Sequence, residues 1–293
     1  MIARSRLAPL VCALLLALQA LAPVSADGAG AAIDTPTRDE VEEKLPRGAQ
    51  LGGRELYDRF LKNRRRLRTA LEEGRILSSD PAGNPQETRF VLRARDYRNA
   101  EDRAVDGIFS KTLVRVTGPR ELQHTAYLYI HRDGRPDEQY VYSPARRRVA
   151  RASLRGQTIA GTDLSFDDFL VSLDDLEDGD YRRLPDEEVE GVRCYVVEAT
   201  MKPTGSSRYT KILVWLEPEH YVPLRTRYWD EVGVAIKELS SPHARIREFD
   251  GVWVPTESTM LDLLEDTRST LTIDRLDVNP TLSDQDFALS ELD

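Results

Sequence analysis

Residues 86–95 read QETRFVLRAR, and this stretch decides the class of fold. Small or apolar side chains alternate along it with charged ones. The first set is Thr88, Phe90, Leu92 and Ala94, and the second is Glu87, Arg89, Arg93 and Arg95. A period of two residues places successive side chains on opposite faces of a β-strand. The stretch therefore predicts a strand of an antiparallel sheet with one buried face and one solvated face.

The same period recurs through most of the chain. Similar runs lie at 112–117, 125–131, 138–143, 147–153, 192–200, 208–216, 222–229, 232–239, 244–249, 252–261 and 269–277. Turn sequences such as Asp133-Gly134-Arg135-Pro136 and Asp250-Gly251 separate several of them. About a dozen short strands joined by short turns predict a mainly β fold, an antiparallel meander that is closed or nearly closed.

Two segments return to helical spacing. Residues 54–73 predict an amphipathic helix that ends at Gly74, with Leu56 and Phe60 on its apolar side. A second helix is predicted over 165–178, and its apolar side consists of Phe166, Phe169, Leu170 and Leu173. Because both helices are apolar on one side only, we expect them to cover the concave side of the sheet.

Acidic residues gather at the start of the second predicted helix. Ser165 followed by Asp168 is typical of a helix N-cap with an acidic partner in the first turn. If Asp163 and Asp168 are capping residues, replacing both with Asn costs about 1–2 kcal/mol of stability. The alternative is acid–base catalysis by paired carboxylates, with Asp167 as a further member.

The N-terminus has the layout of a secretory signal peptide. Arg4 and Arg6 precede an apolar run at 7–22, and small residues lead to a cleavage position after Ala26. Cys12 leaves with the signal, and we do not expect it to carry a lipid. The predicted divisions are a signal peptide at 1–26, a flexible leader at 27–53 and a single domain at 54–293. A chain processed in this way is exported to the periplasm.

Several functions find no support in the residues. The net charge of −9 comes with interspersed basic residues, so no nucleic-acid partner is expected. The four histidines match no metal-site spacing, and no nucleophile elbow, phosphate loop or dinucleotide fingerprint occurs. Cys194 lies among valines, which predicts a buried thiol. We therefore expect no metal, no cofactor and no enzymatic activity.

One segment is similar to a known family. Residues 155–169, RGQTIAGTDLSFDDF, resemble a signature of the outer-membrane lipoprotein-sorting proteins, also called LolA-like. Within it, the motif positions are Gly161, Thr162, Asp163 and Asp168. Residues 140–151, YVYSPARRRVAR, and 253–256, WVPT, also resemble family sequences.

The resemblance implies a fold and a function. The fold would be a strongly curved antiparallel half-barrel of about eleven strands, covered by helices, as in LolA and LolB. The function would be that of a periplasmic carrier or exporter-accessory protein that takes lipid or lipoprotein acyl chains toward the outer membrane. A resistance–nodulation–division-type exporter of the inner membrane is the implied partner, and we expect a monomer.

The expected acyl-chain site lies between the helices and the sheet. Its predicted lining is Leu56, Phe60, Tyr127, Tyr129, Phe166, Phe169, Leu170, Leu173, Trp215, Trp229 and Trp253. Two alternatives stay open. One is an envelope sensor or regulator that binds lipid or lipoprotein as a signal on the same fold. The other is an envelope hydrolase that acts through the Asp163 cluster.

Overall fold

A computed structural model describes most of the chain beyond the N-terminus. The described residues are 50–79, 83–154, 156–159, 161–166, 168, 176, 179–202 and 209–293. The predicted signal peptide and most of the predicted leader lie outside them, and so do Phe169, Leu170 and Leu173 of the second predicted helix.

The described residues form one α-helix, fifteen strands and three short 3-10 helices. In chain order the first elements are α2 (Gly53–Arg64), β1 (Thr69–Ser79), β2 (Pro85–Asp96), β3 (Ile108–Gly118), β4 (Ala126–Arg132), β5 (Glu138–Ser143), β6 (Arg148–Arg151), β7 (Gly179–Val189) and β8 (Val192–Met201). They are followed by β9 (Lys211–Leu216), β10 (Pro223–Trp229), β11 (Ala235–Ser240), β12 (Ile246–Phe249), β13 (Val252–Pro255), β14 (Glu257–Asp262) and β15 (Thr267–Val278). The 3-10 helices are η4 (His243–Arg245), η5 (Asp284–Phe287) and η6 (Leu289–Leu292).

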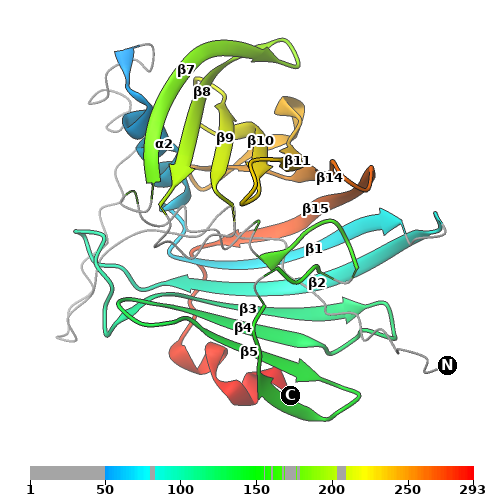
Figure 1. Ribbon diagram of the computed structural model, residues 1–293. Helices are drawn as coiled ribbons and strands as arrows, with labels where there is room; N and C mark the ends of the chain where they lie inside the picture. The colour runs from blue at the N-terminus through cyan, green and yellow to red at the C-terminus, as the bar shows by residue number, and fades with distance from the viewer. Residues whose placement is uncertain are drawn as a thin grey trace.

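Thirteen strands form a single sheet in the order β6-β5-β4-β3-β2-β1-β15-β14-β11-β10-β9-β8-β7, and β12 pairs with β13 as a separate hairpin. All pairs are antiparallel. The sheet is strongly curved: β1–β5 lie across the lower half of the view and β7–β11 across the upper half (Figure 1). It does not close, because β6 and β7 are its two edges.

The two faces of the sheet pack against different elements. We call the face that packs against α2 the inner face and the opposite one the outer face. On β9, Val214 lies on the inner face in one buried cluster with α2, whereas Trp215 lies in a separate cluster on the outer face. The alternation of buried side chains along each strand therefore serves two cores, one on each side.

The C-terminal 3-10 helices cover part of the outer face. Phe287 and Leu292 pack against Leu113, Leu128 and Ile130 of β3 and β4. Figure 1 shows these helices in red beside the lower strands. The buried residues that pack with the inner face come from α2, from β13 (Val252 and Val254) and from described residues between β6 and β7.

The first predicted helix is shorter than the spacing indicated. It ends at Arg64, and residues 69–79, whose first part was predicted to be helical, form β1 near the centre of the sheet. Gly74 is therefore not a helix stop. A Cβ at this position would lie 2.6 Å from Cζ of Phe90 and 2.7 Å from the Thr272 carbonyl oxygen. The glycine allows neighbouring groups to pack closely over the strand.

The sheet also has more strands than the about eleven that the resemblance implied. Besides β1, the pattern missed β7, an edge strand whose sequence GDYRRLPDEEV is mostly charged. Edge strands often carry charge and proline, which disguises the two-residue period. The mainly β character and the curved antiparallel sheet are confirmed, but the sheet has thirteen strands in the described part of the chain.

The last residues of the predicted leader pack into the core. Leu51 is 4% exposed, and the backbone of Gly53 lies directly against β7, where a Cβ would be 2.5 Å from the amide nitrogen of Arg183.

No helix in the part of the chain that the structure describes has the length and apolar character needed to cross a bilayer.

Candidate functional site

The inner face carries a continuous apolar cluster, which we call the inner cluster. From α2 it takes Leu56, Tyr57, Phe60 and Leu61, each no more than 2% exposed. Its sheet members include Phe90, Leu92, Val114, Tyr127, Val197, Val214 and Met260. These positions span strands from β2 to β14, so the inner face is apolar across most of its width. Each fully buried large side chain contributes about 1.5–3 kcal/mol.

A second element completes this cluster from the segment between β6 and β7. We call the described residues between 154 and 168 the cover segment. Leu154, Ile159, Leu164 and Phe166 belong to the inner cluster and are at most 1% exposed. The Phe166 ring lies 5.3 Å from the ring of Tyr127 on β4, within the range of a favourable aromatic pair. The cover segment thus contacts the β1–β6 half of the sheet through apolar groups.

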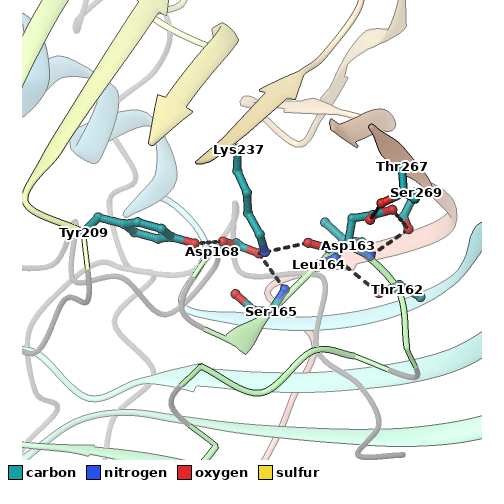
Figure 2. A network of polar contacts seen from close by, with 9 residues as sticks. All are labelled: Thr162, Asp163, Leu164, Ser165, Asp168, Tyr209, Lys237, Thr267 and Ser269. Carbon is teal, nitrogen blue, oxygen red and sulfur yellow. Dashed lines mark hydrogen bonds and ion pairs between the residues drawn. The ribbon is translucent and has the colours of Figure 1, made fainter. Parts of the chain in front are cut away.

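Polar contacts attach the cover segment to the other half of the sheet. We call these residues the clasp: Asp163, Asp168, Tyr209, Lys237, Thr267 and Ser269 (Figure 2). Lys237 on β11 donates to Oδ2 of Asp168 at 2.9 Å and to the carbonyl oxygen of Asp163 at 2.6 Å. The hydroxyl of Tyr209 donates to Oδ1 of Asp168.

The carboxylate of Asp163 contacts the first residues of β15. Thr267 and Ser269 donate their hydroxyl groups to its two oxygens, the latter at 2.6 Å. The backbone N–H of Asp163 donates in return to Oγ of Ser269 at 2.9 Å. The clasp therefore connects one short stretch of chain to β11, to β15 and to the residue two positions before β9.

The clasp is buried, so the loss of one charge of its ion pair would be costly. Lys237 is 4% exposed, and the side chain of Asp168 has no exposure. Burial raises the pKa of nearby Tyr228, and the negative charge of Asp168 raises it further. In a buried pair of this kind, each charge depends on its partner, so the loss of one leaves the other uncompensated. The two charges of the clasp therefore depend on each other.

The capping prediction for these carboxylates is incomplete. The N–H of Ser165 does donate to Oδ2 of Asp168 at 2.6 Å, as a capping box requires. The same oxygen also accepts from buried Lys237, which a solvated cap would not do. Replacing both carboxylates with Asn would leave Lys237 without its counter-charge, so we expect the double Asn variant to cost more than the predicted value of about 1–2 kcal/mol. Both oxygens of each carboxylate are occupied by protein donors, which fits a structural role. Asp167 lies outside the described residues.

The structure brings some predicted lining residues together and separates others. Leu56, Phe60, Tyr127 and Phe166 meet in the inner cluster. Tyr129 is on the same face of β4 as Tyr127, but its hydroxyl donates to Asp137.

Asp137 anchors the surroundings of Tyr129. Its Oδ1 lies 3.2 Å from Nδ1 of His131, whose ring is stacked beside that of Tyr129. Burial alone raises the pKa of Asp137, but the hydrogen bond and charge of His131 and the bond from Tyr129 outweigh burial and lower it. This end of β4 is polar.

The three tryptophans lie apart from the inner cluster. Trp215 is 3% exposed on the outer face, where its indole N–H donates to Glu187 at 2.8 Å. Trp229 is half-buried, with Nζ of Lys211 4.1 Å from its ring centroid. Trp253 on β13 stacks on His220 at 3.7 Å and packs against the outer-face cluster that contains Trp215. Alternation along a strand gives two faces, but it does not say which face meets the helix.

Two functional candidates were missed in the sequence, although their positions carried a signal. Lys237 alternates with Leu239 on β11, so it falls at an inward position of the strand. Glu72 likewise falls at an inward position of β1, between Ala70 and Gly74. A charged residue at an inward position is a candidate for a functional or polar-network role.

The expected structural thiol is found. Cys194 is fully buried, and burial, reinforced by the charge of Glu217, raises its pKa to about 11. A thiol of this kind is protonated at neutral pH and is a weak nucleophile. Among the described residues, no group of three or more His, Cys, Asp or Glu side chains could hold a metal ion.

The curved sheet with its apolar inner face defines a LolA-like protein fold. Three solved structures share it. A DUF1329 family protein from Desulfovibrio piger superposes with a TM-score of 0.72 at 23% identity, covering 82% of this chain and 99% of its own. A domain assigned to outer membrane lipoprotein sorting from Vibrio parahaemolyticus gives 0.68 at 22% identity, covering 80% of this chain and 97% of its own.

A LolA superfamily protein from Nitrosomonas europaea gives a TM-score of 0.63 at 17% identity, covering 81% of this chain and 98% of its own. The resemblance seen in the sequence is thereby confirmed in the fold. The chain belongs to the family whose model matches residues 109–293, a family described as “Uncharacterized protein”. A comparison with curated proteins found no match.

Proposed function

We propose that this protein is a non-enzymatic carrier that binds the acyl chain of a lipid or lipoprotein between the inner face of the sheet and the cover segment. Residues 1–26 would direct it to the periplasm, and its transport would run toward the outer membrane. An inner-membrane exporter of the resistance–nodulation–division type would be its partner, and the protein would act as a monomer. The LolA-like fold supports the lipid-binding part of this proposal.

The observation that carries the proposal is the contrast between the inner cluster and the clasp. The inner cluster is apolar, and Leu56, Phe60, Tyr127 and Phe166 approach one another within it from α2, β4 and the cover segment. Transfer of an acyl chain into such surroundings is favourable by about 0.8 kcal/mol per methylene. An acyl chain that displaced Phe166 from Tyr127 would occupy a surface that is already apolar.

The clasp would allow the cover segment to open and close reversibly as the carrier loads and releases its acyl chain. A carrier must open to load and to release, so its cover needs contacts that can be exchanged. Hydrogen bonds and an ion pair can exchange with water when the cover segment lifts, whereas an all-apolar cover would expose more apolar surface on opening. The cover segment has two separate attachments, an apolar one at Phe166 and a polar one at Asp168. The polar attachment can therefore open before the apolar one.

Binding of an apolar fluorescent probe tests the proposal. Wild-type protein should bind 1-anilinonaphthalene-8-sulfonate or a pyrene-labelled acyl chain with saturation. Tyr127→Arg places a charge against the bound chain, and affinity should fall at least about tenfold. Circular dichroism establishes that the variant is folded, and Phe166→Ala gives a milder second variant in which no charge is buried.

The matched control is Leu128→Ala, next to Tyr127 but on the outer face beneath the C-terminal segment. It should lower stability by about 2–5 kcal/mol and leave probe affinity unchanged. Equal affinities in wild type, Tyr127→Arg and Phe166→Ala, all folded, would contradict an acyl-chain site on the inner face.

A further inference from the structure

A single carboxylic acid lies within the apolar inner face. Glu72 is on β1, where it pairs with Leu92 of β2 and Leu276 of β15. Both leucines belong to the inner cluster, and so does Ala70, two residues before Glu72 on the same face. Glu72 is 1% exposed. Its side chain therefore enters the surface that the cover segment and α2 enclose.

One oxygen of this carboxyl group lacks a hydrogen bond from any residue that the structure describes. Oε1 of Glu72 is buried and has no hydrogen-bond partner in the described part of the chain. The neighbouring Glu73 is an ordinary surface glutamate by comparison. Glu73 points to the outer face, where its side chain is 48% exposed and lies 3.3 Å from a nitrogen of Arg275. Two neighbouring glutamates of one strand thus differ in burial and in partners.

Burial favours the neutral, protonated form of Glu72. Desolvation raises its pKa well above the ordinary value of 4.5, with no compensating charge among the causes. A neutral carboxyl group has an O–H that donates one hydrogen bond and oxygens that accept others. At this position the inner face consequently offers a hydrogen-bond donor in an apolar environment.

Two hydroxyl groups on neighbouring strands share this condition. Thr88 on β2 and Thr112 on β3 are at most 2% exposed, and neither Oγ1 has a hydrogen-bond partner among the described residues. Their strand positions place both on the inner face with Phe90 and Leu92. A buried polar group without a partner costs about 1–3 kcal/mol, and an apolar residue of similar size would avoid that cost. Unpaired polar atoms thus occur on three adjacent strands.

We propose that Glu72 donates a hydrogen bond to a neutral carbonyl oxygen at the head of the bound acyl chain, an ester or an amide. This inference rests on the proposed function and names the chemistry of its cargo. The acyl chain would lie along the inner cluster, and its carbonyl group would stop beside Glu72 at the centre of the sheet. Thr88 and Thr112 lie on opposite sides of Glu72 along the sheet, since Thr88 pairs with Ile76 and Thr112 pairs with Ala94, so they are not part of this polar end.

The geometry disfavours a free fatty-acid anion. Such an anion would bring a full negative charge into an apolar site, and no positive group is among the influences on Glu72. An ester or amide carbonyl brings no charge, and its desolvation is compensated by one hydrogen bond from Glu72. The site should therefore prefer acyl esters and amides to the corresponding acid at a pH at which the acid is ionised.

Calorimetric titration with two lipids of equal chain length tests this preference. The full chain is titrated at pH 8 with 1-oleoylglycerol and with sodium oleate, both below their aggregation concentrations. Wild type should bind the glyceride at least about tenfold more tightly than oleate. Glu72→Leu should weaken glyceride binding about threefold to tenfold, the loss expected for one hydrogen bond.

Two controls accompany this variant. Glu72→Gln keeps an N–H donor and should retain glyceride affinity within about twofold. Glu73→Leu makes the same substitution on the outer face and should bind both lipids as wild type does.

The outcomes separate this inference from the function on which it rests. If wild type binds both lipids and Glu72→Leu leaves the two affinities unchanged, the role of Glu72 is refuted while acyl-chain binding stands. Tighter binding of oleate than of glyceride by wild type would refute the inference in the same way. If wild type binds neither lipid, the proposed function fails and this inference fails with it.

Discussion

Replacement of Lys237 by methionine tests the clasp at its most buried bond. Nζ of Lys237 lies 2.9 Å from Oδ2 of Asp168, and the two side chains are 5% and 0% exposed. Removing one member of a buried ion pair costs about 3–5 kcal/mol, since the other charge stays without its partner. Asp168 retains bonds from Tyr209 and Ser165, so we expect the low end, about 3 kcal/mol. Methionine fills similar volume and leaves no large cavity.

Urea unfolding followed by tryptophan fluorescence gives the change in free energy. The control is Lys62→Met, which removes a 2.6 Å pair with Asp58 from a lysine that is 62% exposed, and should change stability by at most about 0.5 kcal/mol. The double variant Asp168→Asn/Lys237→Met should be less destabilised than the sum of the two single variants, because they remove one interaction. A Lys237→Met cost no greater than that of the control would refute the view that the clasp holds the cover segment.

Four further predictions follow from individual residues. Glu72→Leu should raise stability at pH 7, and urea unfolding across pH should show this advantage shrinking as the pH falls through about 4.5 toward the pH-independent cost of one unpaired buried polar group, about 1–3 kcal/mol, because a raised pKa destabilises the fold only above the ordinary value of 4.5; an advantage unchanged at low pH would contradict it. Gly74→Ala should destabilise by about 1–3 kcal/mol in the same assay, as its Cβ would overlap the Phe90 ring, and a neutral effect would show that the strand relaxes freely. Cys194 should react with iodoacetamide at pH 8 only after urea unfolds the protein, and rapid labelling of the native chain would disprove its burial. N-terminal sequencing of protein exported by its host should begin at Asp27, whereas retention of Met1 would overturn the signal-peptide prediction.

The sheet could be predicted because the pattern that indicates a strand lies within the strand's own sequence. Each half-buried strand repeats the two-residue period, as QETRFVLRAR at 86–95 does, and the period depends only on which side chains meet water. β1 escaped because Leu67 and Leu71 also fit a helical spacing that began in α2, and because Glu72 and Gly74 occupy inward positions where the pattern requires apolar residues.

The site was less predictable because its members meet through the fold. Asp163 and Asp168 were singled out as neighbours in sequence, yet their partners Lys237, Thr267 and Ser269 come from strands at the far end of the chain. The three tryptophans were predicted to line the acyl-chain site, but the structure places them away from the inner cluster. Each sits on a well-formed strand pattern, but the choice between the inner and outer face depends on where α2 packs, and no local period encodes it.

The most direct test of the account maps where an acyl chain binds. Purified protein is irradiated with a monoacylglycerol whose chain carries a diazirine, and the labelled peptides are identified by mass spectrometry. If the chain binds at the inner face, labels should appear on α2 around Leu56 and Phe60 and on β4 at Tyr127. Unlabelled 1-oleoylglycerol should prevent labelling at all these positions. Labels confined to outer-face residues such as Trp215, or labelling that the competitor leaves unchanged, would contradict it.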